Sequence, residues 1–339
     1  MKKENQILLD KLRLINGRIG NTPCVPLSHP HIDLFAKLEY FNFIGSIKDR
    51  AAYHIIEGAI ENGDVDRETT IIEASSGNFA LSVGAICNVL GLKFVAVIDP
   101  GINRVYEKLI RYFSADVLKV EVLDENGGYL LTKLEEVRNY CHRHKNTFWT
   151  NQYENENNFR AHYHGTGAEL CRQFQHLDYA FMGVASGGTI SGTSTRLKEH
   201  FPGIKVVAVD PEGSVIFGNP PKPRLIPGMG SGMVPPLIKK ALIDDVVTVP
   251  EPDTLEGCRQ IFQDHALFVG GSTGSIYFAV QKYFSERVPT AKRPKVVFIC
   301  PDRGIGYADN VYDPEWLVEF KSKRIAAGLD PAPLSMAER

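Results

Sequence analysis

Hydrophobic positions along this chain form two kinds of run. Short apolar runs rich in valine and isoleucine are typical of buried strands, whereas apolar positions at i, i+3 and i+4 are typical of helices. Strands are predicted at residues 34–38, 69–74, 93–99, 116–122, 179–184, 205–210, 245–249, 266–269 and 295–300. Helices are predicted at residues 47–62, 79–90, 103–113, 128–144, 189–197 and 252–265. Repeated strand–helix units are typical of parallel sheets covered by helices on both faces, so we predict an α/β fold.

One lysine has an unusual position at the start of a predicted helix. Lys48 follows Ser46, which suits the N-cap, and therefore lies in the first turn, where the helix macrodipole disfavours a cation. We expect its pKa to be lowered, so that the neutral amine is able to form a Schiff base or to take a proton. Taken alone, a solvated surface lysine explains the same position.

Three loops of small residues each follow a predicted strand, at 75–78, 185–189 and 270–274. The backbone N–H groups of the first helical turn have no partner within the helix, so such loops bind anions. In the second loop glycines let the backbone approach a phosphate, and Ser186 and Thr189 add hydroxyl groups. The loops match neither a Walker A motif nor a dinucleotide fingerprint. Ordinary strand–helix turns favour the same residue types, so the loops alone leave both interpretations open.

Composition limits the classes of function. The chain has 339 residues, 43% of them hydrophobic, with 38 basic and 40 acidic residues, which is enough for two domains with a sizeable core. Without a basic block or a long apolar run, we expect neither a nucleic-acid partner nor a membrane span. The six cysteines form no Cys-x-x-Cys pair, and the N-terminus lacks a signal-like apolar stretch, so we expect a reduced cytoplasmic protein. His162 and His164 lack a third ligand nearby, so we interpret both as structural and expect no metal site.

Together, these stretches resemble the cysteine synthase/cystathionine β-synthase family, which are pyridoxal-phosphate (PLP) enzymes of fold type II. The similar stretches follow the family's order over nearly the whole chain, at residues 20–23, 37–39, 42, 45–50, 75–78, 186–189 and 270–274. The resemblance implies two parallel-sheet, three-layer domains of the tryptophan synthase β-like class. It also implies an N-terminal segment 1–45 that crosses onto the large domain, a smaller mobile substrate-side domain 46–150, a larger PLP-anchoring domain 151–326 and a tail 327–339.

The same resemblance assigns residues to the cofactor. It implies that Lys48 holds PLP covalently, and that in a β-replacement it removes and returns the proton at the substrate Cα. It implies that Asn78 binds the 3′-oxygen of PLP. The residues implied to hold its phosphate are Ala185, Ser186, Gly187, Gly188 and Thr189. Ser272 is expected at the pyridine nitrogen, with Asp302 as the alternative; a hydroxyl there leaves that nitrogen largely unprotonated.

The resemblance also implies where the substrates bind and what they are. The residues expected to bind them are Ser75, Ser76, Gly77, Gln152, Tyr153 and Lys133. Further stretches, at 162–167, 213–218, 301–304 and 311–316, are similar to members that join O-phospho-L-serine to the amine of L-glutamate in 2,3-diaminopropionate synthesis for siderophores. Lys133 stands where those members have arginine, and residues 230–233 lack an arginine expected in that loop.

Two alternatives stay open on the sequence. One is sulfur chemistry in the same fold, as in cysteine synthase or cystathionine β-synthase, whose thiol or sulfide nucleophile needs no cation for a carboxylate. The other is a PLP-binding partner protein without turnover. In every case the family implies a homodimer, and we interpret the apolar segment 7–15 as a surface that packs on the partner subunit.

Overall fold

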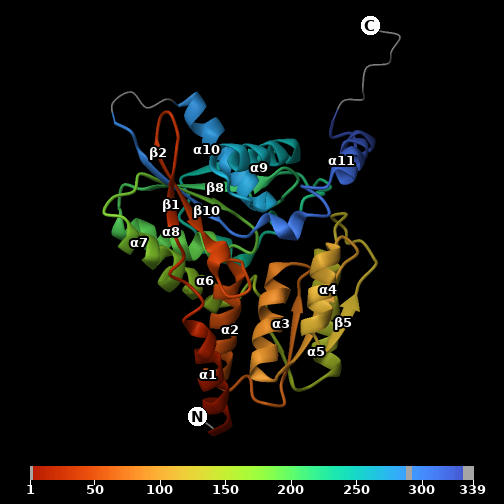
Figure 1. The fold of residues 1–339 in the computed structure, drawn as a ribbon. Helices are drawn as coiled ribbons and strands as arrows, with labels where there is room; N and C mark the ends of the chain where they lie inside the picture. Colours follow the sequence, from red (N-terminus) through yellow and green to blue (C-terminus); the bar gives the residue numbers. More distant parts are fainter. Residues whose placement is uncertain (1–2, 288–291, 331–339) are drawn as a thin grey trace.

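The computed structural model of the protein describes residues 3–287 and 292–330, and they form two sheets (Figure 1). The larger sheet has six strands, in the order β1 (Cys24–Leu27), β2 (Asp33–Leu38), β10 (Lys295–Cys300), β7 (Tyr179–Gly183), β8 (Lys205–Pro211) and β9 (Asp245–Val249). The smaller has four, in the order β5 (Asp116–Lys119), β4 (Lys93–Ile98), β3 (Thr70–Ala74) and β6 (Thr147–Trp149). All neighbours are parallel except β1 and β2, which confirms the predicted α/β fold.

The described part of the chain contains eleven α-helices. They are α1 (Lys3–Asn16), α2 (Lys48–Asn62), α3 (Asn78–Leu90), α4 (Arg104–Phe113), α5 (Leu130–Arg143), α6 (Glu156–Ala161), α7 (Ala168–Gln173), α8 (Gly188–His200), α9 (Glu251–His265), α10 (Gly271–Glu286) and α11 (Pro314–Ala326). A π-helical turn, His162–Gly167, joins α6 to α7. Short 3₁₀ turns occur at Glu39–Phe41, Pro236–Lys240 and Gly304–Tyr307.

Alternating side chains of each strand enter different cores, which gives three layers around each sheet. In the smaller sheet, Ile71 packs with α2 and α3, whereas the next residue, Ile72, packs with α5. In the larger sheet, Phe298 packs with α9 and α10, whereas Ile299 packs with α8. Strands buried on both faces explain why the sequence shows continuous apolar runs there.

The N-terminal helix corrects one prediction. Leu8, Leu9, Leu12 and Ile15 are buried in the protein's own core, where α1 packs beside α2 and α3 (Figure 1). The apolar segment 7–15 is therefore largely used within the subunit, and the predicted packing on a partner was wrong for these four side chains. The chain then crosses to the larger sheet for β1 and β2 before it returns through α2.

A few boundaries also differ from the prediction. Residues 266–269 form no strand, because Ala266 ends α9 in the left-handed conformation (φ 54°) and α10 begins at Gly271. Only Val269 makes a single bridge, to Arg303. In the predicted tail, Asp330 pairs with Arg324 of α11 at 2.8 Å, and residues 331–339 lie outside the described residues. The domain boundaries at 46–150 and 151–326 stay predictions.

No helix within residues 3–287 and 292–330 has the length and apolar character needed to cross a membrane.

Candidate active site

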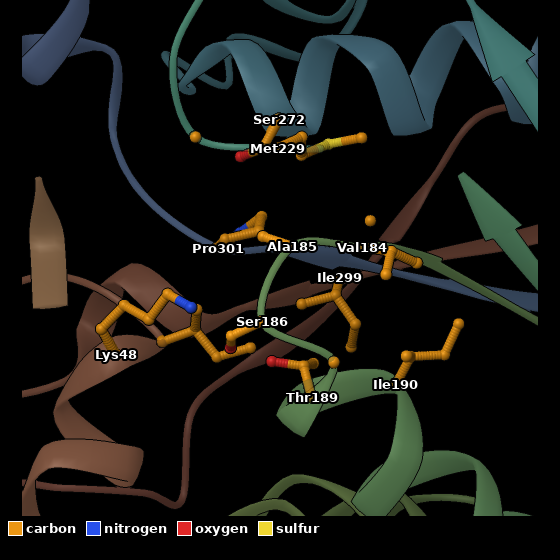
Figure 2. Close-up of a pocket in the computed structure, with 14 residues that line it drawn as sticks. Lys48, Val184, Ala185, Ser186, Thr189, Ile190, Met229, Ser272, Ile299 and Pro301 are labelled. Atoms are coloured by element: carbon orange, nitrogen blue, oxygen red, sulfur yellow. The ribbon is translucent and has the colours of Figure 1, made fainter. Parts of the chain in front are cut away.

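The carboxyl ends of strands from both sheets face one pocket, which has an empty volume of about 1100 Å³ and opens to solvent. The smaller sheet and its helices contribute the loop 75–78, Asp99, Tyr106 and Lys133 to the lining. The larger sheet contributes Ser186, Ser272 and Asp302. A smaller adjoining cavity extends towards Thr189 and shares Lys48 with the first (Figure 2).

Lys48 is the first residue of α2 and borders both cavities. Its N-cap is Ile47 rather than the predicted Ser46, but the Ser46 hydroxyl still accepts a hydrogen bond from the Lys48 backbone N–H at 3.2 Å. The lysine amine donates to the Gln152 side-chain oxygen at 3.5 Å. Burial lowers the Lys48 pKa from 10.5 to about 8, although the carboxylates of Glu73 and Asp302 oppose this decrease. The predicted decrease is therefore present, with burial rather than the macrodipole as its main cause.

The loop 185–189 forms a cradle at the start of α8, as predicted. Gly187 has a left-handed backbone (φ 86°), and α8 begins at Gly188 with its free N–H groups towards the smaller cavity. A side chain at Gly188 would lie 2.1 Å from Asn158 Oδ1, so only glycine fits there. The hydroxyls of Ser186 and Thr189 lie beside the same space as the Lys48 amine (Figure 2). This arrangement fits a phosphate group.

The structure brings both candidates for the pyridine nitrogen together. Ser272, in the first turn of α10, donates to Asp302 Oδ1 at 3.5 Å, and both side chains are buried. Asp302 also accepts from Asn78 Nδ2 at 2.6 Å and from the Tyr307 hydroxyl at 3.1 Å. Burial raises the Asp302 pKa to about 6, although these hydrogen bonds lower it. Ser272 as the direct partner of the pyridine nitrogen stays a prediction.

Asn78 is fixed at both ends of its amide group. Besides its bond to Asp302, its oxygen accepts from the Tyr106 hydroxyl at 2.7 Å. Neither Tyr106 nor Tyr307 was predicted, because each reaches the pocket from an element without a recognisable motif. Asn78 lines the pocket, and its bond to the 3′-oxygen of PLP stays a prediction.

The predicted substrate residues also line the pocket: Ser75, Ser76, Gly77, Lys133, Gln152 and Tyr153. The Ser75 hydroxyl accepts from the backbone N–H of Ala80 at 3.3 Å, which fixes the start of α3. Lys133 is 8% exposed, so it does not lie on a solvated helix face. It pairs with Asp99, which the sequence did not single out, and donates to the Ser76 hydroxyl at 3.3 Å.

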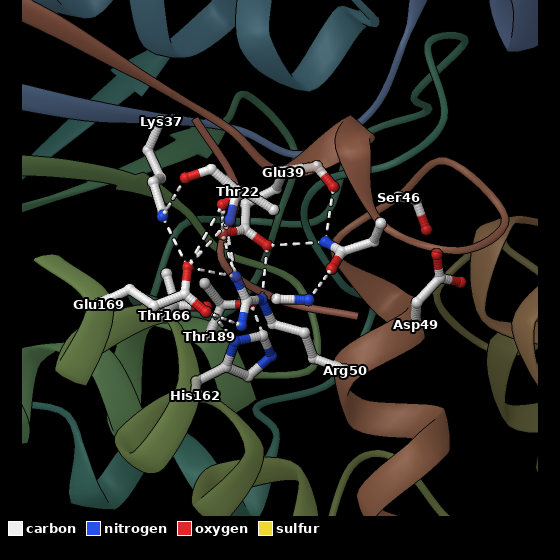
Figure 3. A network of polar contacts seen from close by, with 12 residues as sticks. Thr22, Lys37, Glu39, Ser46, Asp49, Arg50, His162, Thr166, Glu169 and Thr189 are labelled. Atoms are coloured by element: carbon white, nitrogen blue, oxygen red, sulfur yellow. Dashed lines mark hydrogen bonds and ion pairs between the residues drawn. The ribbon is translucent and has the colours of Figure 1, made fainter. Parts of the chain in front are cut away.

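Four buried charges hold the lysine-bearing helix in place (Figure 3). Arg50 Nε donates to Glu39 at 2.6 Å, and its Nη1 donates to Glu169 at 2.7 Å. Lys37 also contacts Glu169, at 2.7 Å. Burial alone would raise the Glu169 pKa, but Arg50 and Lys37 hold it at about 2. Arg50 thus fastens α2 to the 3₁₀ turn that follows β2 and to α7.

The two histidines that were interpreted as structural have different surroundings. His162 is buried and lies behind the phosphate cradle, where its ring nitrogens contact Thr166 at 3.1 Å and Thr189 at 3.3 Å. His164 is exposed. The residues that the structure describes contain no group of three potential metal ligands among His, Cys, Asp and Glu.

An arginine does lie beside the loop 230–233, although not within it. Arg224 Nη1 donates to the carbonyl of Ser231 at 3.2 Å and to that of Gly213 at 3.4 Å. Sequence reasoning missed it because the irregular segment folds back on itself.

Comparison with known proteins identifies the family. The model of the pyridoxal-phosphate dependent enzyme family matches residues 15–302. The chain belongs to this family. It is 40% identical to the N-(2-amino-2-carboxyethyl)-L-glutamate synthase of Ralstonia nicotianae over 324 residues, which cover 94% of this chain and 95% of the relative. It is 37% identical to the enzyme of the same name from Cupriavidus metallidurans, over 93% of this chain and 94% of the relative.

Solved structures show the same fold. The O-acetylserine dependent cystathionine β-synthase of Helicobacter pylori has a TM-score of 0.80 and 27% identity, covering 87% of this chain and 97% of that one. A hydrogen sulfide-producing enzyme of Fusobacterium nucleatum has a TM-score of 0.80 and 31% identity, covering 88% and 98%. The protein is a fold type II enzyme that depends on PLP and catalyses β-replacement.

The residues of the pocket fit PLP. The cradle 185–189 would hold its phosphate, Lys48 its aldehyde carbon, and Ser272 and Asn78 its ring. When bound, PLP withdraws electrons from the Cα of an amino-acid substrate. Lys48 would then be the base next to that carbon. Burial lowers its pKa to about 8, so near neutral pH a larger fraction of it is the neutral, proton-accepting amine than for a free lysine.

The rate at which PLP combines with the cofactor-free protein is expected to rise with pH through an inflection near 8. Attack on the aldehyde requires the neutral amine, and the pKa of Lys48 is about 8. Below this pH the ammonium form is unreactive; above it the rate reaches a plateau. The growth of cofactor absorbance after mixing, followed over a series of pH values, measures this. A lysine amide in solution is the control, with an inflection near about 10.4; the same inflection in the protein would contradict the expectation.

Proposed function

We propose that this enzyme joins O-phospho-L-serine and L-glutamate by β-replacement, giving N-(2-amino-2-carboxyethyl)-L-glutamate, a precursor of 2,3-diaminopropionate. The observation that carries the proposal is the position of Lys133, a buried cation on the substrate side of the pocket that is not needed for the cofactor. The two relatives bearing that name, each covering more than nine-tenths of this chain, support it.

In this reaction the loop 75–77, together with Gln152, binds the carboxylate of the serine donor. Its backbone N–H groups lie at the start of α3, where an anion is favoured. Lys48 takes the Cα proton of the donor, the phosphate leaves from Cβ, and the amine of glutamate adds to Cβ. Lys48 returns the proton to Cα, so that it ends in the state in which it began.

Lys133, Ser186 and Tyr153 bind the acceptor in this proposal. An amine nucleophile has to be neutral and aligned at the moment it attacks Cβ, so the carboxylates of glutamate need fixed partners. The Lys133 ammonium supplies a charge-assisted hydrogen bond, and Ser186 and Tyr153 border the same pocket between Lys133 and Lys48.

Sulfur chemistry is the second candidate, because the two similar structures are a cystathionine β-synthase and a hydrogen sulfide-producing enzyme. A single set of assays separates the two. The purified enzyme is given O-phosphoserine or O-acetylserine, each with glutamate or with sulfide, and the products are measured by mass spectrometry. We expect the highest kcat/KM with O-phosphoserine and glutamate. If the enzyme turned over the serine donors with sulfide but not with glutamate, cysteine synthase would replace this proposal.

Replacing Lys133 with alanine is expected to reduce kcat/KM for glutamate by about tenfold to a hundredfold, because a charge-assisted hydrogen bond contributes about 1.5–3 kcal/mol. The change in cofactor absorbance on mixing with O-phosphoserine alone is expected to persist, since Lys133 binds the acceptor. Stopped-flow absorbance measures both steps, first with donor and then with glutamate.

The matched control is Lys133→Arg, which keeps the charge and adds a bidentate donor for a carboxylate. It is expected to retain glutamate use. Equal loss in both variants, or loss of the donor step in Lys133→Ala, would show that Lys133 is needed for the fold of the pocket rather than for the acceptor.

We also propose that the enzyme is a cytoplasmic homodimer that serves siderophore synthesis and has no nucleic-acid partner. The family resemblance supports the homodimer and the pathway. Free thiols at Cys24, Cys87, Cys141, Cys171, Cys258 and Cys300 support a reducing compartment. The nearly balanced charge, with 38 basic and 40 acidic residues, gives no attraction for a polyanion.

A further inference from the structure

One ion pair in the pocket has no role in holding the cofactor. The charged side chains that border the pocket, among the described residues, are Lys48, Asp302, Lys133 and Asp99. Lys48 and Asp302 lie at the cofactor end, where their contacts are with Gln152 and with Asn78, Tyr307 and Ser272. The other two pair with each other, and their side chains are 11% and 13% exposed.

Asp99 is held rigidly at the end of β4. Its Oδ1 accepts from the backbone N–H of Gly101 at 3.0 Å, and its Oδ2 accepts from the Ser76 hydroxyl at 2.6 Å and from Lys133. Its own backbone N–H donates to Ser76 at 3.1 Å. Burial would raise the Asp99 pKa, but Lys133 and Ser76 lower it below the usual value, so the carboxylate is ionised at neutral pH.

A ligand that separates this pair has to replace both partners. A carboxylate that takes Lys133 leaves Asp99 as an unpaired and largely buried charge, which is strongly unfavourable. An amino acid carries both an ammonium and a carboxylate, so it pairs with Lys133 and with Asp99 at once and leaves neither charge alone. Anions without an amine, and sulfide, have no such complement to Asp99.

We propose that Asp99 determines the specificity for an amino-acid acceptor by binding its ammonium group, while Lys133, released from Asp99, binds its carboxylate. This inference rests on the proposed function, in which glutamate is the acceptor. Asp99 places the nitrogen next to the loop 75–77, which binds the carboxylate of the donor. The ion pair thus selects amine acceptors before any bond is made. The bound ammonium then gives one proton to water, which reaches the open pocket, and the neutral amine adds to Cβ.

The test uses the holoenzyme with Asp99→Asn and two ligands, one with an ammonium group and one without. Asparagine keeps the shape and the hydrogen bond from Gly101 but removes the charge. L-Glutamate carries the ammonium group; glutarate has the same two carboxylates without it and is used as a competitive inhibitor against glutamate. We expect the KM for glutamate to rise at least about tenfold, from the loss of a charge-assisted contact. We expect the Ki of glutarate to fall, because Lys133 is left free.

The matched control is Asp244→Asn, which removes a carboxylate paired with a lysine, Lys198, at 2.7 Å, away from the pocket. It is expected to change neither constant. A change of both constants in the same direction in Asp99→Asn, or of neither, would show that Asp99 only restrains Lys133 and would overturn the inference. Failure of the wild-type enzyme to use glutamate would overturn the proposed function as well, so the two failures are distinguishable.

Discussion

Replacing Lys48 with alanine is expected to lower kcat by at least about a hundredfold. A positioned proton-transfer group contributes about a hundredfold to ten-thousandfold. The loss also includes the covalent bond to PLP, so the purified variant is expected to release its cofactor on dialysis. The fold is expected to remain, because alanine is the most favourable residue in a helix and Lys48 is the first residue of α2. The absorbance of bound PLP, circular dichroism and the assay with O-phosphoserine and glutamate measure these effects.

Borohydride reduction locates the covalent bond independently of activity. In the wild-type protein, reduction followed by peptide mapping is expected to find the label on Lys48. Lys240→Ala is the matched control for Lys48→Ala, because it removes an exposed lysine that pairs with Glu156 outside the pocket. A label on any other lysine would contradict the assignment of Lys48, even if the alanine variant were inactive.

Replacing Arg50 with methionine is expected to lower the free energy of unfolding by about 3–5 kcal/mol, the cost of leaving a buried charge without its partner. The guanidinium is 3% exposed and neutralises Glu39 and Glu169, which are 0% and 5% exposed. Methionine fills a similar volume but leaves Glu39 without its cation and Glu169 with the Lys37 ammonium alone. Urea unfolding followed by circular dichroism measures the difference.

An exposed pair supplies the contrast for Arg50. Lys323 pairs with Glu319 at 3.1 Å on the surface of α11, where side chains are more than half exposed, so Lys323→Ala is expected to change stability little. If Arg50→Met lowered the free energy of unfolding by less than about 1 kcal/mol, the buried network would contribute no more than an exposed ion pair does. The two carboxylates would then have to be hydrated in the variant.

The sequence predicts best where one element dictates its own structure. The strands at 245–249 and 295–300 match the prediction because each is an apolar run bounded by polar residues. The loops at 75–78 and 185–189 were found because a strand, small residues and a helix follow one another directly. By contrast, β1 was missed: it is four residues long and contains Pro26, which is tolerated there because β1 is an edge strand.

Residues that reach the pocket through tertiary structure were harder to find. Asp99 is the last residue of a predicted strand, and β4 lies next to β3, so its carboxylate meets the loop 75–78. The position of Asp99 at a strand end was visible in the sequence, but its contact with the loop 75–78 could be inferred only once the order of the strands was known. Tyr106 and Tyr307 gave no signal, because single aromatic residues on helical turns are mostly core residues. For Lys48 the direction of the pKa change followed from its position, but burial is visible only in three dimensions.

The position of β10 has a consequence for the order in which the protein can fold during its synthesis. β10 lies between β2 and β7 in the larger sheet, yet it is the last of the described strands to leave the ribosome. The smaller sheet is built entirely from residues made earlier and is able to form first. The edges of β2 and β7 stay unpaired until residues 295–300 arrive, and unpaired edges recruit other chains. Premature termination before residue 295 is therefore expected to yield aggregates rather than a truncated enzyme.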